Sequence, residues 1–256
     1  MPGYFTFTSR RSTHTAPKCP PSRTLMQPAS PTMVPLPSAP INGSPVPHLT
    51  SIHSVTGRGP YGDSRYRGNC GGHLIRDLIQ YFGAKRVLDP MTGSGTCRDV
   101  CTELGTECVS FDLKLGQNAT DPASYRDLGQ FDFIWLHPPY WRMIRYNDDL
   151  RCLSAAPTLD AFLDSMKALL ACGRDVLTPN GVIAVLIGGF SDYDGHQRRH
   201  IPLAALTNQV ALDTGLWPAC TEIIRFQHGN TSSRRAYTSS FIPGLHDTCM
   251  VFRKGQ

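Results

Sequence analysis

No apolar run in this sequence approaches the roughly 20 residues that a membrane-spanning helix needs. The N-terminus also lacks the uninterrupted apolar core of a secretory signal. No CxxC pair occurs among the nine irregularly spaced cysteines, which is typical of reduced thiols and argues against a disulfide framework or a zinc site. Cys97 and Cys101, one helical turn apart, are interpreted as packing residues. These absences predict a cytoplasmic protein with no membrane partner and no bound metal.

Acidic residues are missing from residues 1–60, a Ser- and Thr-rich segment that holds 12 of the 21 prolines. Such a composition cannot bury enough apolar surface to offset the entropy of ordering, so we expect a disordered tail. This tail carries the whole formal charge excess of +5. Residues 61–256 are neutral overall and long enough for one catalytic domain, so charge gives only weak support for a nucleic-acid partner.

Two common nucleotide-binding patterns, GxGxxG and GK[ST], are also absent, which disfavours dinucleotides and ATP. Residues 86–96, RVLDPMTGSGT, instead form a strand-like run that ends in an acid and crosses a glycine-rich turn into a helix pattern. Glycines 93 and 95 allow the backbone to approach a ligand closely. Asp89 can accept hydrogen bonds from an amino group, and Asp112 can accept both hydroxyls of a ribose. The alternative is a tight turn followed by a surface acid.

Helical and strand-like patterns alternate from residue 73 onward, which predicts an α/β domain with a parallel sheet and right-handed crossovers. The expected helices cover 73–82, 96–104, 122–128, 158–177 and 202–214. The expected strands cover 86–89, 107–112, 131–136, 182–188, 221–226 and 248–253. No helix separates the last two strands, so we expect them to be antiparallel, and residues 191–200 form a polar loop in this prediction.

A second motif, FDFIWLHPPYW at 131–141, ends an apolar strand in two prolines and aromatic residues. Consecutive prolines cannot extend a strand ladder and fix the backbone rigidly. We expect them to aim the carbonyls of His137 and Pro138, and the ring of Tyr140, into the crevice at the carboxyl ends of the strands. The two motifs would then form a cofactor pocket and a reaction centre side by side.

Together the motifs resemble those of S-adenosylmethionine-dependent amino-methyltransferases acting on DNA. DPMTGSGT is similar to the cofactor motif of that family, usually DPFxGSGT, and HPPY to its catalytic motif, usually Asp, Asn or Ser before Pro-Pro and an aromatic residue. The likeness covers residues 61–254, including RYRGNCGGHLIRDLI, PNGVIAVLIG and FIPGLHDTCMVFRK. It implies a Rossmann-like class I methyltransferase fold with a mostly parallel seven-stranded sheet, an antiparallel C-terminal strand pair, and S-adenosylmethionine as cofactor.

The resemblance also assigns roles. An exocyclic amine is a poor nucleophile because its lone pair is delocalised, and hydrogen bonds to the His137 side chain and the Pro138 carbonyl would localise it. Tyr140 would stack on a base rotated out of the helix, and Trp141 would extend that surface or pack at its rim. The implied catalytic residues are His137, Pro138, Pro139 and Tyr140. The implied cofactor-binding residues are Asp89, Pro90, Thr92, Gly93, Gly95, Thr96, Asp112, Asn69 and Asp121.

His137 departs from the family pattern. A neutral imidazole has one acceptor nitrogen and a protonated one has none, so an ordinary pKa near 6.5 predicts lower turnover below about pH 6. The substitution also removes the hint that separates adenine N6 from cytosine N4. Methylation at carbon 5 of cytosine is disfavoured because no Pro-Cys pair is present.

Several assignments keep an alternative. Asp121 precedes Pro122 and is read more readily as a helix N-cap than as a cofactor ligand, and Asn69 can belong to a plain turn. Arginines at 142, 145, 234 and 235 can contact phosphates or lie on the surface, and the basic cluster at 196–200 is interpreted as solvated.

The resulting hypothesis is an enzyme that methylates adenine N6 or cytosine N4 in DNA. Its alternatives are the same chemistry on RNA or on a protein glutamine amide, or a catalytically silent nucleic-acid-binding relative in which His137 marks lost activity.

Overall fold

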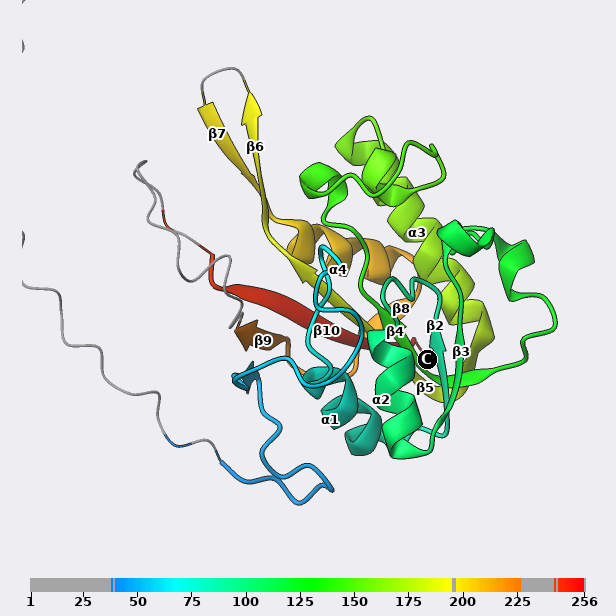
Figure 1. Cartoon of the computed structure of the whole chain (residues 1–256), viewed down its shortest axis with the longest axis vertical. Helices are drawn as coiled ribbons and strands as arrows, with labels where there is room; N and C mark the ends of the chain where they lie inside the picture. The colour runs from blue at the N-terminus through cyan, green and yellow to red at the C-terminus, as the bar shows by residue number, and fades with distance from the viewer. Residues whose placement is uncertain (1–37, 39, 195–196, 227–241, 243, 256) are drawn as a thin grey trace, which may run out of the picture. The chain divides into compact units, whose positions relative to one another are not determined.

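The computed structural model describes residues 38, 40–194, 197–226, 242 and 244–255 (Figure 1). Every helix and strand among the described residues belongs to the compact unit within residues 39–256. None of the described helices is both long and apolar enough to cross a membrane. The α-helices among the described residues are α1 His73–Phe82, α2 Thr96–Leu104, α3 Leu159–Val176 and α4 Leu203–Asp213.

One sheet organises the unit, with strand order β1-β9-β10-β5-β4-β2-β3 and β8 paired to β10. The neighbours β3, β2, β4 and β5 run parallel, and β10 runs antiparallel to both β5 and β9. The strands of this sheet are β1 Ile52–His53, β2 Arg86–Asp89, β3 Glu107–Ser110, β4 Phe131–Leu136, β5 Leu177–Gly188, β8 Leu216–Pro218, β9 Ile223–Phe226 and β10 His246–Lys254. This topology confirms the expected Rossmann-like class I methyltransferase fold, although the described sheet has eight strands and not seven.

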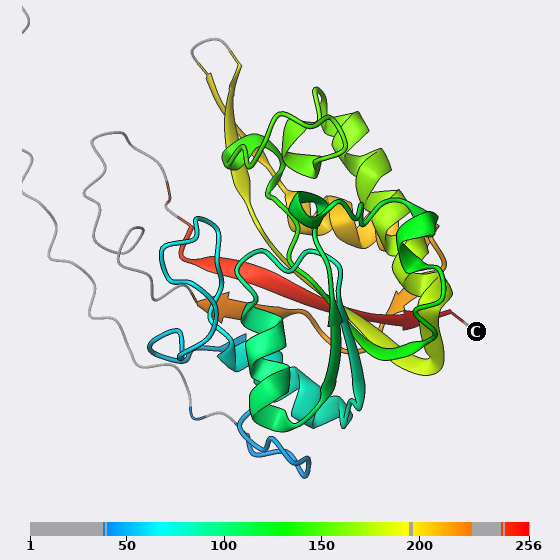
Figure 2. The ribbon, with the colours of Figure 1, turned by 45° about the vertical axis from the view of Figure 1, so that its right-hand side comes forward.

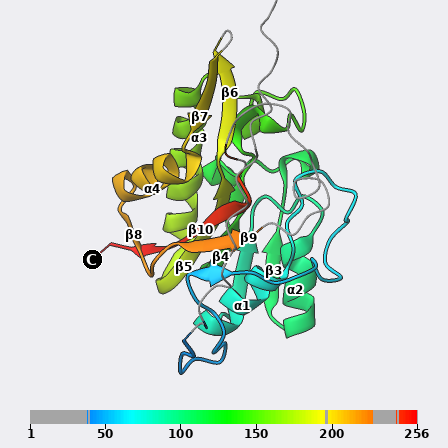
Figure 3. The ribbon, with the colours of Figure 1, turned by 90° about the vertical axis from the view of Figure 1, so that its left-hand side faces the viewer.

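Both faces of the sheet are covered, and Figures 2 and 3 show α1 and α2 on one side with α3 and α4 on the other. Successive strand residues point to opposite faces, so the apolar run of β5 contributes to two separate cores. Ile183, Val185 and Ile187 pack into the core beneath α3 and α4. Val182, Ala184 and Leu186 pack into the core beneath α1 and α2. Burial on both faces explains why β5 is apolar throughout.

Local signals set most helix boundaries as predicted. Gly83 and Gly105 follow α1 and α2 in the left-handed region, with φ of 62° and 64°, and their N–H groups bond to carbonyls of the last helical turn. Thr158 caps α3 by accepting a hydrogen bond of 3.1 Å from the Ala161 N–H.

Two predicted elements were wrong. The helix expected near 122–128 is a single 3-10 turn, η2 Pro122–Tyr125, because the backbone leaves the helical region at Arg126. The polar loop expected at 191–200 is an antiparallel hairpin, β6 Phe190–Asp194 and β7 Gln197–Ile201, which projects from the sheet in Figure 1. Most of the described hairpin lacks the apolar alternation of a buried strand, so its pattern resembles that of a loop.

The folded unit also begins earlier than expected. Within residues 40–60, β1 pairs in parallel with β9, and Val46 and His53 are 1% and 6% exposed. The Nε2 atoms of His48 and His53 each lie 3.1 Å from the Asp77 carboxylate on α1. Composition averaged over the proline-rich segment hid these few buried residues, so the predicted boundary at residue 60 is corrected for this stretch. Residues 1–37 lie outside the described residues.

Candidate active site

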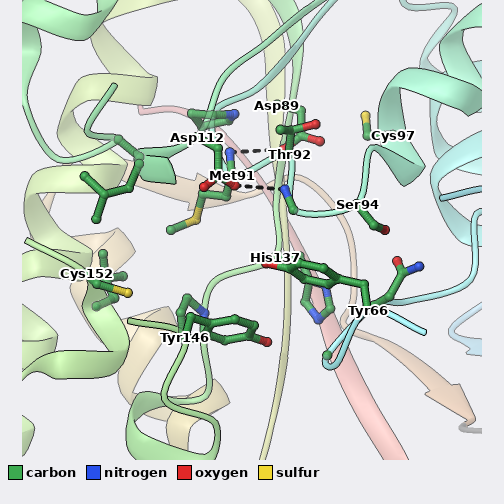
Figure 4. Close-up of a pocket in the computed structure, with 18 of the residues that line it drawn as sticks. Tyr66, Asp89, Met91, Thr92, Ser94, Cys97, Asp112, His137, Tyr146 and Cys152 are labelled. Carbon is green, nitrogen blue, oxygen red and sulfur yellow. Dashed lines mark hydrogen bonds between the residues drawn. The ribbon is translucent and has the colours of Figure 1, made fainter. Parts of the chain in front are cut away.

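The candidate site lies where the strand order reverses. The chain passes from β2 outward to β3 and then returns to β4 on the other side of β2, and ligands of open α/β sheets bind at such a point. A cavity of about 870 Å³, open solvent at its mouth included, lies there (Figure 4). The predicted site residues that line it are Asn69, Asp89, Pro90, Thr92, Gly93, Thr96, Asp112, His137 and Pro139.

The glycine-rich turn is held to the end of β3 by hydrogen bonds. The Thr92 N–H donates to the Phe111 carbonyl at 3.0 Å, and the Gly93 N–H donates to Asp112 Oδ2 at 2.9 Å. Asp112 Oδ1 accepts from the Lys114 N–H at 3.1 Å. Each carboxylate oxygen keeps a further lone pair for a ligand. Gly93 has a φ of 49°, a left-handed conformation that a side chain would strain.

Gly95 acts differently from Gly93, because it does not line the cavity. It is the N-cap of α2, with a φ of 89°, and a Cβ there would lie 2.6 Å from the Arg98 guanidinium. Its conformation turns the chain from the glycine loop into α2 and thereby places the N-terminus of that helix beside the cavity.

Asp89, at the end of β2, is 3% exposed and accepts a hydrogen bond of 3.2 Å from the Met91 N–H. Burial raises the pKa of this carboxyl to about 8, since removal from water disfavours the charged form. The free protein therefore holds Asp89 mostly neutral at pH 7. A cationic group placed against it would favour the ionised form.

Two hydroxyl groups of the same turn are placed to bind a polar ligand. Thr92 Oγ1 and Ser94 Oγ are buried and have no hydrogen-bond partner among the described residues. Thr96 Oγ1 donates to Asn69 Oδ1 at 2.6 Å, which ties α2 to the segment before α1. Because buried polar atoms are nearly always satisfied, the two orphaned hydroxyls indicate a cradle for a ligand with polar groups.

Two of the four residues of the HPPY motif line the cavity, and two do not. His137 and Pro139 line the cavity, whereas Pro138 is buried and Tyr140 is not part of the lining. The Tyr140 ring packs on β5, where a Cβ on Gly188 would come within 2.6 Å of it. The sequence led us to expect this ring in the crevice. The space left by Gly188 and the electrostatic interaction of the phenol with the Asp247 carboxylate hold the ring away from the cavity.

A chain of polar contacts runs from the last two strands to His137. Arg225 Nη1 on β9 donates to Asp247 Oδ2 at 2.8 Å, the Asp247 carboxylate interacts electrostatically with the Tyr140 hydroxyl, and that hydroxyl lies 3.3 Å from His137 Nε2. Burial, followed by the Asp247 charge, raises the pKa of the Tyr140 phenol, so the phenol keeps its single proton and directs it toward the carboxylate. The phenol oxygen must then accept from His137 Nε2–H, which leaves Nδ1 as the acceptor nitrogen. Sequence reasoning missed Arg225 and Asp247, because nothing local connects them to the HPPY motif.

Two tyrosines on the cavity wall were also missed. Tyr66 and Tyr146 stack with ring centroids 6.1 Å apart and an interplanar angle of 18°, and Figure 4 shows both rings beside His137. Asn118 lines the cavity, whereas Asp121 does not and instead caps η2 by accepting from the Ala123 N–H at 2.9 Å. The N-cap alternative for Asp121 is therefore confirmed. An aromatic residue in the RYRGN stretch before the glycine turn was the one available signal for Tyr66.

The remaining candidates among the described residues lie outside the cavity lining. Arg142 is ion-paired with Asp192, and Arg145 with Asp148 at 2.8 Å. Trp141 is buried at 6% exposure and donates from Nε1 to the Ala156 carbonyl at 3.0 Å, so it packs in the core. Exposed basic side chains on β7 are Arg198, Arg199 and His200, while His196, Arg234 and Arg235 lie outside the described residues.

Similarity to known proteins is found among solved structures. No model of a known protein family and no curated protein matches this chain. The chain is similar to TTHA0409 of Thermus thermophilus, a provisionally named DNA modification methylase in complex with S-adenosyl-L-methionine, with 18% identity, coverage of 55% of this chain and 52% of that one, and a TM-score of 0.41. The match thus spans about half of that protein.

Two further similar structures carry other names. TrmN from Thermus thermophilus has 17% identity, coverage of 74% and 51%, and a TM-score of 0.41. A 1,6-didemethyltoxoflavin-N1-methyltransferase from Burkholderia thailandensis has 15% identity, coverage of 75% and 80%, and a TM-score of 0.44. At these identities and TM-scores the similarity carries no argument about substrate or activity.

Proposed function

We propose that this chain is an S-adenosylmethionine-dependent methyltransferase that acts on an exocyclic amino group of a base in DNA, adenine N6 or cytosine N4, with the base rotated out of the duplex. The observation that carries the proposal is that one cavity is lined both by the glycine-rich turn and by His137 and Pro139 of the HPPY motif. A donor site and an acceptor site that share a cavity are what a group transfer requires.

The donor set of the turn fits S-adenosylmethionine. Asp89 would take the amino group, Asp112 the ribose hydroxyls, and the orphaned Thr92 and Ser94 hydroxyls further polar groups. When bound, this cofactor would supply an electrophilic methyl group on a sulfonium: as an amine lone pair forms the N–C bond to the methyl carbon, the S–C bond would break and the neutral thioether would leave.

His137 serves as a hydrogen-bond acceptor in this proposal and not as a base. Burial lowers the pKa of its imidazole to about 4, so the ring cannot keep a proton at neutral pH. Nδ1 accepts one amine hydrogen, which localises the nitrogen lone pair. Pro138 does not line the cavity, so its carbonyl is not assigned the second hydrogen that the sequence suggested. The proton that the methylated nitrogen loses passes to water. Aimed acceptors in a buried site supply most of the rate, since they need no reorganisation.

The two cavity tyrosines favour a planar acceptor. The Tyr66 and Tyr146 rings lie nearly parallel, with an interplanar angle of 18° and centroids 6.1 Å apart, and each has an aromatic face on which a base would stack. We assign the stacking role to this pair in place of Tyr140. A glutamine amide has no ring for these faces, which makes a protein acceptor the weaker alternative. The same stacking serves RNA, so only an assay separates it from DNA.

The test is methyl transfer from radiolabelled donor to duplex DNA, structured RNA and a release-factor-like protein, with nucleoside analysis of the product. We expect N6-methyladenine or N4-methylcytosine from DNA, and loss of the product with His137→Ala. Preferential labelling of RNA or protein would overturn the assignment to DNA. Donor binding without any transfer would support the catalytically silent alternative.

The pH dependence of turnover gives a second check. Because the pKa of His137 is lowered to about 4, its neutral acceptor form persists above that value. We therefore expect flat kcat from pH 8 to about pH 5 at saturating donor, with loss only toward pH 4. This corrects the loss below about pH 6 expected from an ordinary imidazole. His137→Gln, which keeps an acceptor oxygen but does not titrate, is the control. A loss of kcat with a midpoint near pH 6.5 in the wild type but not in His137→Gln would contradict the lowered pKa of His137.

Donor binding should release a proton through Asp89. The carboxyl, with its pKa of about 8, is mostly protonated at pH 7 in the free protein and ionises against the donor's ammonium group. We expect release of about one proton, and a Kd that falls about tenfold between pH 6 and pH 7. Calorimetry in buffers of different ionisation enthalpy measures the release. Asp89→Asn should abolish it, whereas equal release in both proteins would exclude Asp89 as its source.

A further inference from the structure

Three cysteines converge beneath the candidate cofactor cavity. Cys97 and Cys101 lie one turn apart on α2, and Cys108 lies on β3, the strand that follows this helix. No two of their sulfur atoms are more than 4.8 Å apart. Among the residues that the structure describes, no other group of three His, Cys, Asp or Glu side chains converges in this way. The cluster therefore differs from the scattered thiols that the sequence suggested.

The setting of the cluster is that of a built site. Cys97 and Cys101 are 1% and 0% exposed, and Cys108 is half-buried. Cys97 also lines the cavity, which gives an ion an entry path. Three sulfurs that hold Zn²⁺ at ~2.3 Å in tetrahedral geometry lie about 3.8 Å apart. A separation below 4.8 Å closes to that value by small side-chain rotations.

We propose that Cys97, Cys101 and Cys108 bind one thiophilic metal ion of the Zn²⁺ class, with its fourth coordination position toward the cavity. Each thiol loses its proton on binding, so the three thiolates and a divalent ion carry one net negative charge. The Arg98 guanidinium interacts electrostatically with Cys108 and offsets that charge. Soft thiolate ligands select Zn²⁺ over Mg²⁺ or Ca²⁺. The expectation of no bound metal rested on the absence of a CxxC pair, on the irregular cysteine spacing and on Cys97 and Cys101 as packing residues, and it is replaced by this proposal.

The ion would brace the two elements that carry the cofactor cradle. α2 begins directly after the glycine-rich turn, and β3 leads to Asp112, whose carboxylate holds Gly93. A metal between α2 and β3 would therefore resist separation of the turn from Asp112. This role does not depend on which acceptor is methylated.

The experiment uses the full chain, stripped of metal with a chelator under reducing, anaerobic conditions, and titrated with Co²⁺ as a spectroscopic probe. We expect one equivalent to bind with a thiolate-to-cobalt charge-transfer band, and Zn²⁺ to displace it. Cys101→Ser and Cys108→Ser should weaken binding by roughly 100-fold or more. Cys172→Ser removes a thiol on α3 that is also buried, and it should leave Co²⁺ binding unchanged.

Circular dichroism checks that each variant is folded. X-ray absorption of the Zn²⁺-loaded wild type, which needs no variant, should show three sulfur neighbours. Absence of the charge-transfer band from folded wild-type protein, fewer than three sulfur neighbours, or equal binding by both folded serine variants would overturn the proposal.

Discussion

Replacing Tyr140 with phenylalanine is expected to lower kcat for methyl transfer by about two- to fivefold and to change the donor Kd by less than about threefold. Phenylalanine fills the same space against Gly188 but cannot join Asp247 to His137. The imidazole can then adopt either neutral tautomer, and in one of them Nδ1 carries the proton and no longer accepts from the amine. Steady-state kcat and KM for the acceptor, with calorimetric donor binding, measure the effect.

A double-mutant cycle separates positioning from structural damage. A glutamine at position 137 has no tautomers, so Tyr140→Phe should cost little in a His137→Gln background. Asp247→Asn should resemble Tyr140→Phe, because it removes the charge that orders the phenol. Tyr81→Phe, at an exposed tyrosine on α1, is the matched control and should leave kcat unchanged. Wild-type turnover by Tyr140→Phe, or full additivity in the cycle, would show that Tyr140 does not set the His137 tautomer.

Asp112→Ala is expected to weaken donor binding by about 100-fold or more. The ribose hydroxyls of the donor would lose two hydrogen bonds to a charged carboxylate, at ~1.5 kcal/mol or more each. The Gly93 and Lys114 N–H groups lose their acceptor, and the turn loses its link to the end of β3. Calorimetric titration with the donor measures the loss, and a smaller loss is expected for Asp112→Asn, which keeps one acceptor oxygen.

Asp121→Ala is the control for this prediction, because both acids were candidate cofactor ligands from the sequence. Asp121 only caps η2, so its loss should lower stability by about 1 kcal/mol and leave donor affinity unchanged. Equal effects of the two substitutions on affinity would place the cofactor elsewhere in the cavity.

Elements with a strong local signal were predicted almost to the residue. The helical spacing of apolar residues over 73–82 and the glycine that follows define α1, because amphipathic periodicity and a left-handed cap act within a few turns. The β6–β7 hairpin and residues 40–60 were missed, since their order depends on pairing and burial that composition does not report. β1, for example, is a strand only because β9 lies beside it.

In the candidate site, too, some features follow from the sequence and others only from the tertiary structure. Sequence alone determined that an acid and a glycine turn follow one buried strand, β2, and that a proline pair follows another, β4, since each pattern is contiguous and reflects the backbone's own geometry. Only the tertiary structure decided that Tyr140 faces Asp247 and not the cavity, and that Cys108 meets Cys97 and Cys101. Side-chain direction depends on the space and partners that distant strands supply, such as Gly188 and Asp247 on neighbouring β5 and β10. Those contacts join segments far apart along the chain, and no local pattern encodes them.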